Sequence, residues 1–358
     1  MQNAWERLAA VLDKIPNSYT HVDDDSHIAL LKWIFTEEEA ELASRMKLRG
    51  ETAEEMGQRL EETPSYLTPL LETMTKKGQI RAWNSSTGRR YCLIPFAVGI
   101  WEEQVGRMDK DFARLAEDYF RKGKGAGLFD TEPAIMKVIP VNKAIKSELE
   151  IKPYQIAENL INASKSWGVR ECICKKQQNM LDNPCSYPDT VCIILGKNED
   201  SLAEDEQTIK LTREEALEKL REAEDAGLVH CTMNMQSGHY YICNCCTCCC
   251  QVLRGVSEAG QPYAYVKSDY IISVDEDLCS GCETCVERCQ FDALSVPDDI
   301  VSIDSNRCIG CGVCAVTCPE DALSLIDRPG EHKEPPEKFM DWMTQKAMSR
   351  GVDPSDLL

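Results

Sequence analysis

Eight cysteines near the C-terminus have the spacing needed to hold iron. They form two runs of the pattern C-x2-C-x2-C-x3-C, namely Cys279, Cys282, Cys285 and Cys289, then Cys308, Cys311, Cys314 and Cys318. Three thiolates two residues apart can hold one corner of an iron–sulfur cube, and the fourth follows a short turn that directs it elsewhere. Disulfides do not require two copies of this spacing, and zinc sites rarely take four cysteines from one run. The pattern therefore predicts iron–sulfur clusters.

The residues around the two runs repeat as well. DLCSGCETCVERCQFDALSV and NRCIGCGVCAVTCPEDALSL align without a gap. Residues 270–328 resemble the bacterial dicluster ferredoxins, although Gln290 stands where many such domains have proline. The resemblance implies two [4Fe–4S] clusters whose ligand sets cross between the repeats. One set is Cys279, Cys282, Cys285 and Cys318, and the other is Cys308, Cys311, Cys314 and Cys289.

A second region rich in cysteines lies within residues 136–269, whose helix and strand patterns predict an α+β domain. Its cysteines form two candidate metal-binding groups, Cys172, Cys174, Cys185 and Cys192, then Cys243, Cys245, Cys246, Cys249 and Cys250. We expect at least one further [4Fe–4S] cluster here, with zinc and a reactive dithiol as the alternatives. Adjacent cysteines diverge, so the block ICNCCTCCC could contribute to two sites, or hold one metal and leave a thiol free. The isolated Cys92 and Cys231 are interpreted as small buried side chains.

Residues 1–100 have the pattern of a winged helix-turn-helix domain, with several helices followed by two strands. Capping boxes are predicted at Thr36 with Glu39 and at Thr52 with Glu55. A basic run favours phosphate contact, through Lys76, Lys77, Arg81, Arg89 and Arg90. The helix expected to read bases begins PSYLTP, which offers no Arg, Asn or Gln to base edges. We therefore favour protein docking over DNA binding for this domain.

The remaining segments are a predicted linker helix within residues 101–135, covering 101–122, and a tail helix within 329–358. The fold class is thus α+β and multidomain, with the winged-helix-like domain, the cysteine-rich domain and the ferredoxin-like domain in that order. Taken together, the cysteine-rich block, the terminal dicluster domain and the winged-helix-like start resemble a family of multi-cysteine iron–sulfur proteins of anaerobes. The resemblance implies a redox function and does not indicate a substrate.

Size and composition narrow the function classes. The chain has 358 residues, of which 43% are hydrophobic, enough for two or three domains. Its 20 cysteines, with no signal-peptide pattern at the N-terminus, indicate a reducing cytoplasm. No stretch approaches the ~18 apolar residues of a membrane span. The net charge of −20 does not suit a general nucleic-acid binder.

The charge is concentrated in the ferredoxin-like region. Residues 270–328 carry 12 acidic and 3 basic side chains. An acidic face suits docking to a basic patch on a redox partner protein, although it also serves solubility.

These features predict a low-potential one-electron carrier that passes electrons between redox partners, in a protein or oxidoreductase subunit with no assigned catalytic residue. Two alternatives remain open. One is a redox-responsive winged-helix regulator, and the other is a cluster-dependent reductase of a small substrate. No flavin or nicotinamide fingerprint accompanies the cysteines.

Overall fold

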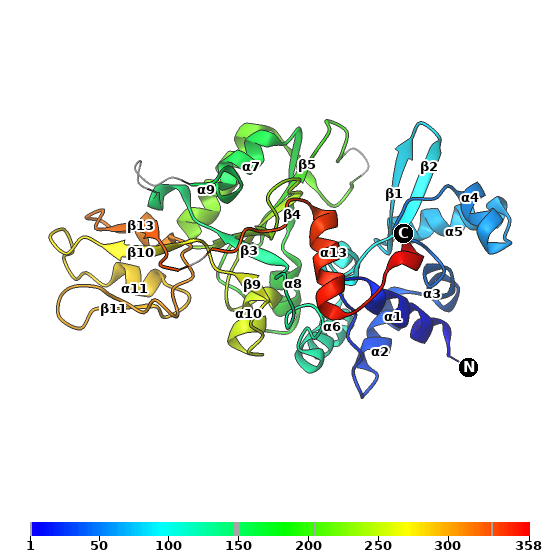
Figure 1. Cartoon of the computed structure of the whole chain (residues 1–358), viewed down its shortest axis with the longest axis horizontal. Coiled ribbons are helices and arrows are strands. Elements are labelled where there is room, and N and C mark those ends of the chain that lie inside the picture. The colour runs from blue at the N-terminus through cyan, green and yellow to red at the C-terminus, as the bar shows by residue number, and fades with distance from the viewer. Residues whose placement is uncertain (1, 146–150, 203–204, 331) are drawn as a thin grey trace. The chain divides into compact units, whose positions relative to one another are not determined.

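The structure is a computed structural model that describes residues 2–145, 151–202, 205–330 and 332–358 (Figure 1). It is 39% helix and 17% strand, which is the mixed α+β composition that the sequence predicts. The chain divides into two compact units. Unit 1 comprises residues 1–132, 177–183 and 343–358, and unit 2 comprises residues 133–176 and 184–342. Within the described residues, no helix has the length and apolar character needed to cross a membrane.

Unit 1 consists of helices followed by a β-hairpin. Its elements are α1 (Ala4–Lys14), α2 (Ser26–Ile34), α3 (Glu37–Ala43), α4 (Ala53–Leu60), α5 (Pro64–Lys76), β1 (Ile80–Ser85), β2 (Gly88–Leu93) and α6 (Lys110–Gly123). Both predicted capping boxes are confirmed, because the Thr36 and Thr52 hydroxyls accept hydrogen bonds from the backbone N–H groups of Glu39 and Glu55. The order of helices and hairpin matches the predicted order, while the winged-helix assignment itself stays a prediction.

The linker differs from the single helix expected over residues 101–122. A 3-10 turn covers Glu102–Gln104, and α6 begins only at Lys110. The Asp109 carboxylate accepts a hydrogen bond from the backbone N–H of Phe112, 2.8 Å away, and so caps a new helix at that point. In the tail, α13 spans Phe339–Arg350.

Unit 2 is built on a seven-stranded sheet with the strand order β6-β4-β5-β8-β7-β3-β9. The strands are β3 (Met136–Ile139), β4 (Ser166–Glu171), β5 (Thr190–Gly196), β6 (Ile209–Leu211), β7 (Val229–Met233), β8 (Tyr241–Cys245) and β9 (Tyr265–Val266). The helices are α7 (Ala157–Ala163), α9 (Arg213–Ala226) and α10 (Gln251–Ser257), and residues 173–176 of α8 (Ile173–Met180) also belong to this unit. All pairings are antiparallel except β3 with β9.

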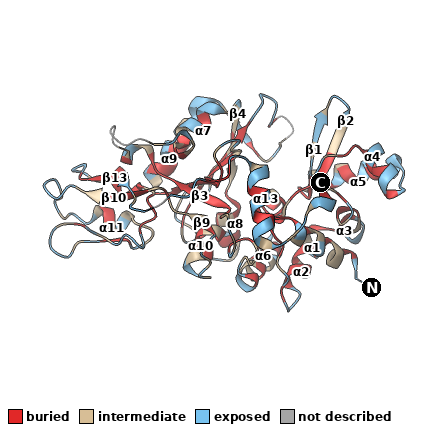
Figure 2. Cartoon of the chain, viewed as in Figure 1, coloured by how far each residue is buried: buried red, intermediate tan, exposed pale blue. Residues whose placement is uncertain are grey.

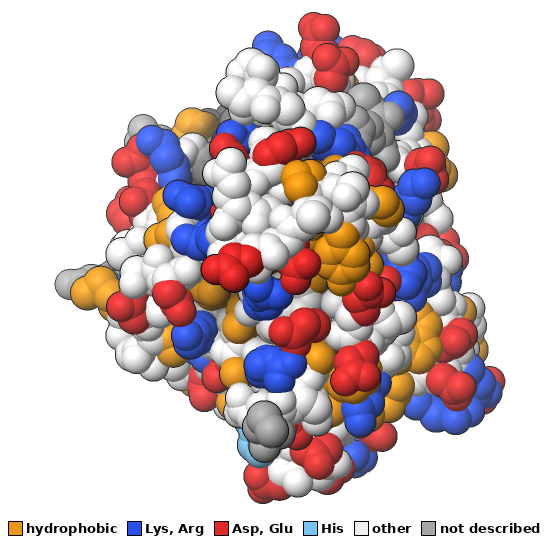
Figure 3. Space-filling model, turned by 90° about the vertical axis from the view of Figure 1, so that its right-hand side faces the viewer, with side chains coloured by type: hydrophobic (Ala, Val, Ile, Leu, Met, Phe, Trp, Pro, Cys, Tyr) orange, Lys and Arg blue, Asp and Glu red, His pale blue; other side chains and the backbone are white. Residues whose placement is uncertain are grey.

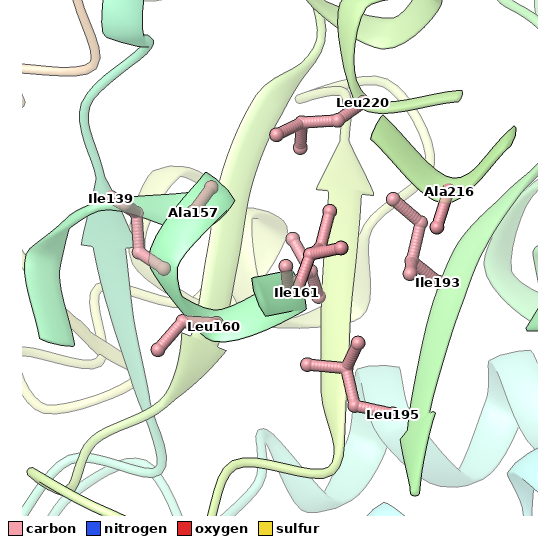
Figure 4. Packing of buried hydrophobic residues seen from close by; sticks show 9 residues of the cluster. Ile139, Ala157, Leu160, Ile161, Ile193, Leu195, Ala216 and Leu220 are labelled. Atoms are coloured by element: carbon pink, nitrogen blue, oxygen red, sulfur yellow. The ribbon is translucent and has the colours of Figure 1, made fainter. Parts of the chain in front are cut away.

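The two faces of this sheet carry different side chains. Ile193 pairs with Ile242, and both pack in a core with α7 and α9 (Figure 4). Successive residues of a strand point to opposite faces. Cys192 and Cys243, the next positions along β5 and β8, therefore lie on the other face, and Cys231 pairs with Cys243 across β7 and β8. The sheet thus presents a row of three cysteines on the face opposite the helix-packed core.

The C-terminal part of unit 2 has internal two-fold repetition. Its elements are β10 (Tyr270–Val274), α11 (Thr284–Arg288), β11 (Leu294–Ser295), β12 (Ser302–Ile303), α12 (Val313–Val316) and β13 (Leu323–Asp327). The first strand of one repeat pairs with the last strand of the other, so β10 pairs with β13 and β11 with β12. Each short helix carries the third cysteine of its run. Figure 2 shows that the loops around α11 are largely exposed, in contrast to the buried strands of the seven-stranded sheet.

Candidate iron–sulfur and metal sites

Two cavities lie within the repeated C-terminal region, and each is lined by four cysteines. The cysteines of the first are Cys279, Cys282, Cys285 and Cys318. The cysteines of the second are Cys289, Cys308, Cys311 and Cys314. These are the two crossed sets that the resemblance implied. We call them cavity I and cavity II.

The donor sets fit the clusters that the spacing implies. Each cavity offers four thiols, with Ile309, Val313 and Phe291 around cavity II. The acidic Glu283 and Glu320 also line cavity I, whereas Arg288 and Gln290 line cavity II. Cavity I is nearer to solvent, because Cys282 is exposed whereas Cys308 and Cys314 are buried. The two sites therefore share ligand chemistry and differ in access to water, which is one of the protein's means of setting cluster potential.

The backbone around the two cavities is matched position by position. The Asp275 carbonyl accepts from the backbone N–H of Cys279 at 3.1 Å, and Asp304 does the same for Cys308 at 2.9 Å. Each third cysteine is preceded two residues earlier by a left-handed residue, Glu283 with φ of 63° and Gly312 with φ of 73°. A glycine is needed at the latter position, because a Cβ there would come within 2.5 Å of the Ala144 Cβ.

Burial determines how readily these thiols ionise. Burial raises the pKa of Cys311 to about 12 and raises that of Cys314 well above its ordinary value. The exposed Cys282 differs, because its hydrogen bond with the Thr284 hydroxyl lowers its pKa. A cluster binds cysteine as thiolate, so these protons must leave when it binds. The positive charge of the iron ions then stabilises the buried thiolates.

Gln290 and Arg288 join the cavity II repeat to the preceding α+β fold. The Gln290 side chain accepts a hydrogen bond from the Thr247 backbone N–H at 2.8 Å and donates one to the Gly227 carbonyl at 2.5 Å. Arg288 donates to the carbonyls at the C-terminus of α9, including Glu224 at 2.8 Å. The position where proline was expected thus forms a link between Cys289 and the cysteine block.

Six cysteines of the α+β fold shift one another's pKa in a closed ring. In order around the ring they are Cys172, Cys174, Cys250, Cys245, Cys243 and Cys192, which returns to Cys172. Cys231 contacts the ring through Cys245. Hydrogen bonds from the Cys174 and Cys192 thiols lower the pKa of Cys172 well below its ordinary value. We call these six residues the six-thiol ring.

The other four cysteines form a separate tetrad, Cys185, Cys246, Cys248 and Cys249. Their sulfur atoms all lie within 4.8 Å of one another. The Cys185 Sγ lies 3.6 Å from the Sγ atoms of both Cys246 and Cys248, and the Cys248 and Cys249 Sγ atoms are 3.7 Å apart. The hydrogen bond from Cys249 is the main reason that the pKa of Cys246 falls to about 6.

This division differs from the two groups expected from sequence. Cys185 lies with the later block, while Cys172, Cys174 and Cys192 lie with Cys243, Cys245 and Cys250 in the six-thiol ring. Cys248 was absent from the expected ligands. A turn at residues 247–249 brings it beside Cys249. Cys245 and Cys246 belong to different groups, and whether the block serves two sites stays a prediction.

Cys231 was also expected to be isolated, and it is not. It faces Cys243 across neighbouring strands and contacts Cys245. Cys92, in contrast, is a buried thiol on β2 of unit 1, and burial raises its pKa to about 11. The cross-strand register, which is not visible in the sequence, accounts for this difference.

Lys175 and Tyr265 lie beside these thiols. Lys175 is 2% exposed, and its ammonium donates to the carbonyls of Pro188 at 2.7 Å and Asn244 at 3.3 Å. Burial opposes its charge, but the neighbouring Cys172 and Cys246 thiols outweigh this and raise its pKa. Burial, aided by the charges of Cys231, Cys311 and Cys250, raises the pKa of Tyr265 to about 12. Thiols of cavity II and of the six-thiol ring therefore both act on the charge state of Tyr265.

The basic run of unit 1 is largely neutralised by acids from other elements. Arg89 pairs with Glu72 at 2.6 Å, Arg90 with Glu55 at 3.1 Å and Lys77 with Glu39 at 2.6 Å. On the face shown in Figure 3, acidic and basic side chains are interspersed and do not gather into a basic patch. The sequence suggested free cations because these acids lie outside the run. Ion pairing leaves less positive charge for phosphate.

Comparison with known proteins identifies the C-terminal region. Residues 272–295 and 301–324 each match the family described as 4Fe-4S binding domain. No curated protein and no solved structure matched the chain. With two such domains, the protein is an iron–sulfur protein that binds two [4Fe–4S] clusters.

Proposed function

We propose that this protein is a low-potential one-electron carrier whose exchange point with redox partners is cavity I. The observation that carries the proposal is the pair of cavities lined by the crossed cysteine sets. A bound [4Fe–4S] cluster accepts and releases single electrons. The residues of the chain hold two such groups within one small fold, and they set access and polarity differently at each.

The difference in exposure between cavity I and cavity II indicates which of them exchanges electrons with a partner protein. Cys282 and its neighbours Ser280 and Glu283 are exposed, so a partner can approach cavity I closely. Cavity II is lined partly by Val229 of the seven-stranded sheet, and the Cys311 carbonyl accepts a hydrogen bond from Val141 at 2.9 Å. Electrons therefore enter or leave at cavity I and reach the α+β fold through cavity II.

The acidic character of the region supports a partner with a basic docking surface. Residues 270–328 carry 12 acidic side chains, and Glu283 and Glu320 line cavity I itself. Opposite charge accelerates encounter and orients the partners, and salt screens it. Electron exchange with a basic partner should accordingly slow as ionic strength rises.

The six-thiol ring extends the path as the site of a third [4Fe–4S] cluster. Six thiols are more than one ion binds and are sufficient for a cluster with several irons. The pKa of Tyr265 is raised by burial and by the charges of both Cys311, of cavity II, and Cys250, of this ring. A reductase role would place its substrate at this ring, and the chain offers no observation that favours it over electron carriage.

Matched substitutions in the two repeats test the crossed ligation. Cys318→Ser should remove the cavity I cluster, and Cys289→Ser should remove the cavity II cluster, each with a loss of about four irons per chain. Electron paramagnetic resonance of the reduced, anaerobically purified variants should show the complementary cluster in each case. If Cys318→Ser instead affected the Cys308, Cys311 and Cys314 cluster, the crossed assignment would be wrong.

Transfer itself is tested by the reduced wild-type protein. It should pass electrons to a basic one-electron acceptor such as cytochrome c at a rate that falls with added salt. A rate that is independent of salt would contradict docking at the acidic face.

A further inference from the structure

We propose that the tetrad Cys185, Cys246, Cys248 and Cys249 is a distinct site for a single divalent transition-metal ion, zinc or iron, in tetrahedral thiolate coordination. The site would be separate from every iron–sulfur cluster. It does not depend on the proposed electron-transfer function, because its argument rests on the positions of four sulfur atoms.

The sulfur separations match one ion. With a metal–sulfur distance near 2.3 Å, tetrahedral geometry places sulfurs about 3.8 Å apart. The tetrad has separations of 3.6, 3.6 and 3.7 Å, and all four sulfurs lie within 4.8 Å of one another. Little movement would be needed to close the site around an ion.

The cluster cavities of the same chain provide the contrast. In a cubane the four thiolates attach to four different irons, and the four cysteines that line each of cavities I and II are not among the described sets whose ligand atoms all lie within 4.8 Å of one another. Across the described residues, the tetrad alone brings three or more candidate metal ligands within 4.8 Å of each other. Its sulfurs are therefore too close for a cubane and suited to one ion.

The local fold explains why these four thiols converge. The backbone N–H groups of Cys249 and Cys250 donate to the Cys246 carbonyl at 3.4 and 3.1 Å, which closes a tight turn. This turn directs Cys246, Cys248 and Cys249 to one side. Gln290 holds the turn through the Thr247 N–H. Cys185 arrives from the loop that precedes β5.

Lys175 supplies a second, independent observation. Its buried ammonium donates to the carbonyl of Pro188, on the loop that carries Cys185, and to that of Asn244, within the cysteine block. No carboxylate of the described residues lies within ion-pair distance of it. A divalent ion with four thiolates carries a net charge of −2, and the buried Lys175, whose pKa is raised by Cys172 and Cys246 despite its burial, offsets part of that charge.

Binding requires no oxidant or reductant. Four thiols release four protons as the divalent ion binds, and the ion keeps its oxidation state. Either zinc or ferrous iron satisfies this chemistry, and the metal content distinguishes them.

Metal analysis of anaerobically purified protein tests the site. Cys248→Ser should lose one zinc or one iron per chain, and Cys185→Ser should do the same, while the resonance signals of the two [4Fe–4S] clusters stay unchanged. Cys248 is exposed, so its substitution should leave folding intact. Cys92→Ser, at a buried thiol outside every group, is the control and should lose no metal.

Cobalt provides a readout independent of native loading. Wild-type protein produced with Co²⁺ should bind one Co²⁺ at this site and show thiolate-to-cobalt charge-transfer absorption, which Cys248→Ser should abolish. A loss of about four irons in Cys248→Ser, or unchanged metal in both tetrad variants, would overturn the proposal.

Discussion

The dicluster region and the α+β region before it are both rich in cysteine, but they organise their thiols in different ways. The dicluster region places eight cysteines in two local runs and exchanges one between them, around cavities I and II. The α+β region collects ten from two loops and neighbouring strands, and divides them into a ring of six and a tetrad. Local spacing determines the first arrangement, and long-range strand pairing determines the second.

The sites of the two regions depend on different structural features. In the dicluster region each site draws three ligands from one turn and short helix, so the turn itself must have the right backbone. In the α+β region a site depends on the register of β5, β7 and β8, because Cys192, Cys243 and Cys231 are cross-strand neighbours. A slip of one residue would move these thiols to the opposite face.

The largest expected effect comes from a substitution in the six-thiol ring, which tests whether the ring holds a third cluster. Cys192→Ser should remove about four irons per chain if the ring holds a third cluster, because it breaks the ring between Cys172 and Cys243. The signals of the two dicluster centres should remain, since neither cavity includes Cys192. Iron analysis and electron paramagnetic resonance measure both, with Cys92→Ser as the control. Unchanged iron in Cys192→Ser would remove the third cluster from the proposal.

Much of the dicluster region could be predicted from the sequence. Two copies of one spacing indicate the candidate ligands, and the resemblance implies that the fourth cysteine of each run belongs to the other ligand set. This was possible because the positions of these cysteines are set either by local spacing or by the internal repeat. The capping boxes at Thr36 and Thr52 were predictable for the same reason, since each involves residues only three apart.

The grouping of the other cysteines could not be predicted in this way. Cys185 lies 61 residues from Cys246 in the chain, yet the two sulfurs are 3.6 Å apart. Sequence distance placed Cys185 with Cys192, whereas the fold separates them into different groups. The charges of Arg89 and Arg90 were misleading for the same reason, because their acidic partners come from other elements.

A smaller effect compares the matched left-handed positions of the two repeats. Gly312→Ala should damage the cavity II cluster, because the new Cβ would meet Ala144 at 2.5 Å and the φ of 73° disfavours a side chain. Glu283→Ala is the matched control, because that position already carries a side chain at φ of 63°. Iron content should fall toward one dicluster centre in the first variant and stay complete in the second. Equal iron content in both variants would show that the structure around Ala144 accommodates the new Cβ without loss of the cluster.

The smallest expected effect concerns the link between the two regions. Gln290→Pro restores the residue that Pro319 provides in the second repeat, so the turn should accept it and both dicluster centres should be retained. It removes the hydrogen bonds to Thr247 and Gly227, and leaves the Thr247 N–H without its acceptor. The loss should cost about 1–3 kcal/mol of stability.

Denaturant unfolding of the anaerobic protein, followed by far-ultraviolet circular dichroism, measures that cost. Pro319→Gln, at the matched position of the other repeat, is the control for the change of turn residue alone. Because Thr247 lies between two cysteines of the tetrad, Gln290→Pro should also speed loss of the tetrad ion to a chelator. If the unfolding midpoint and the rate of metal loss were both unchanged, Gln290 would have no role in joining the two regions. They would then be joined only by the continuous chain and by Arg288.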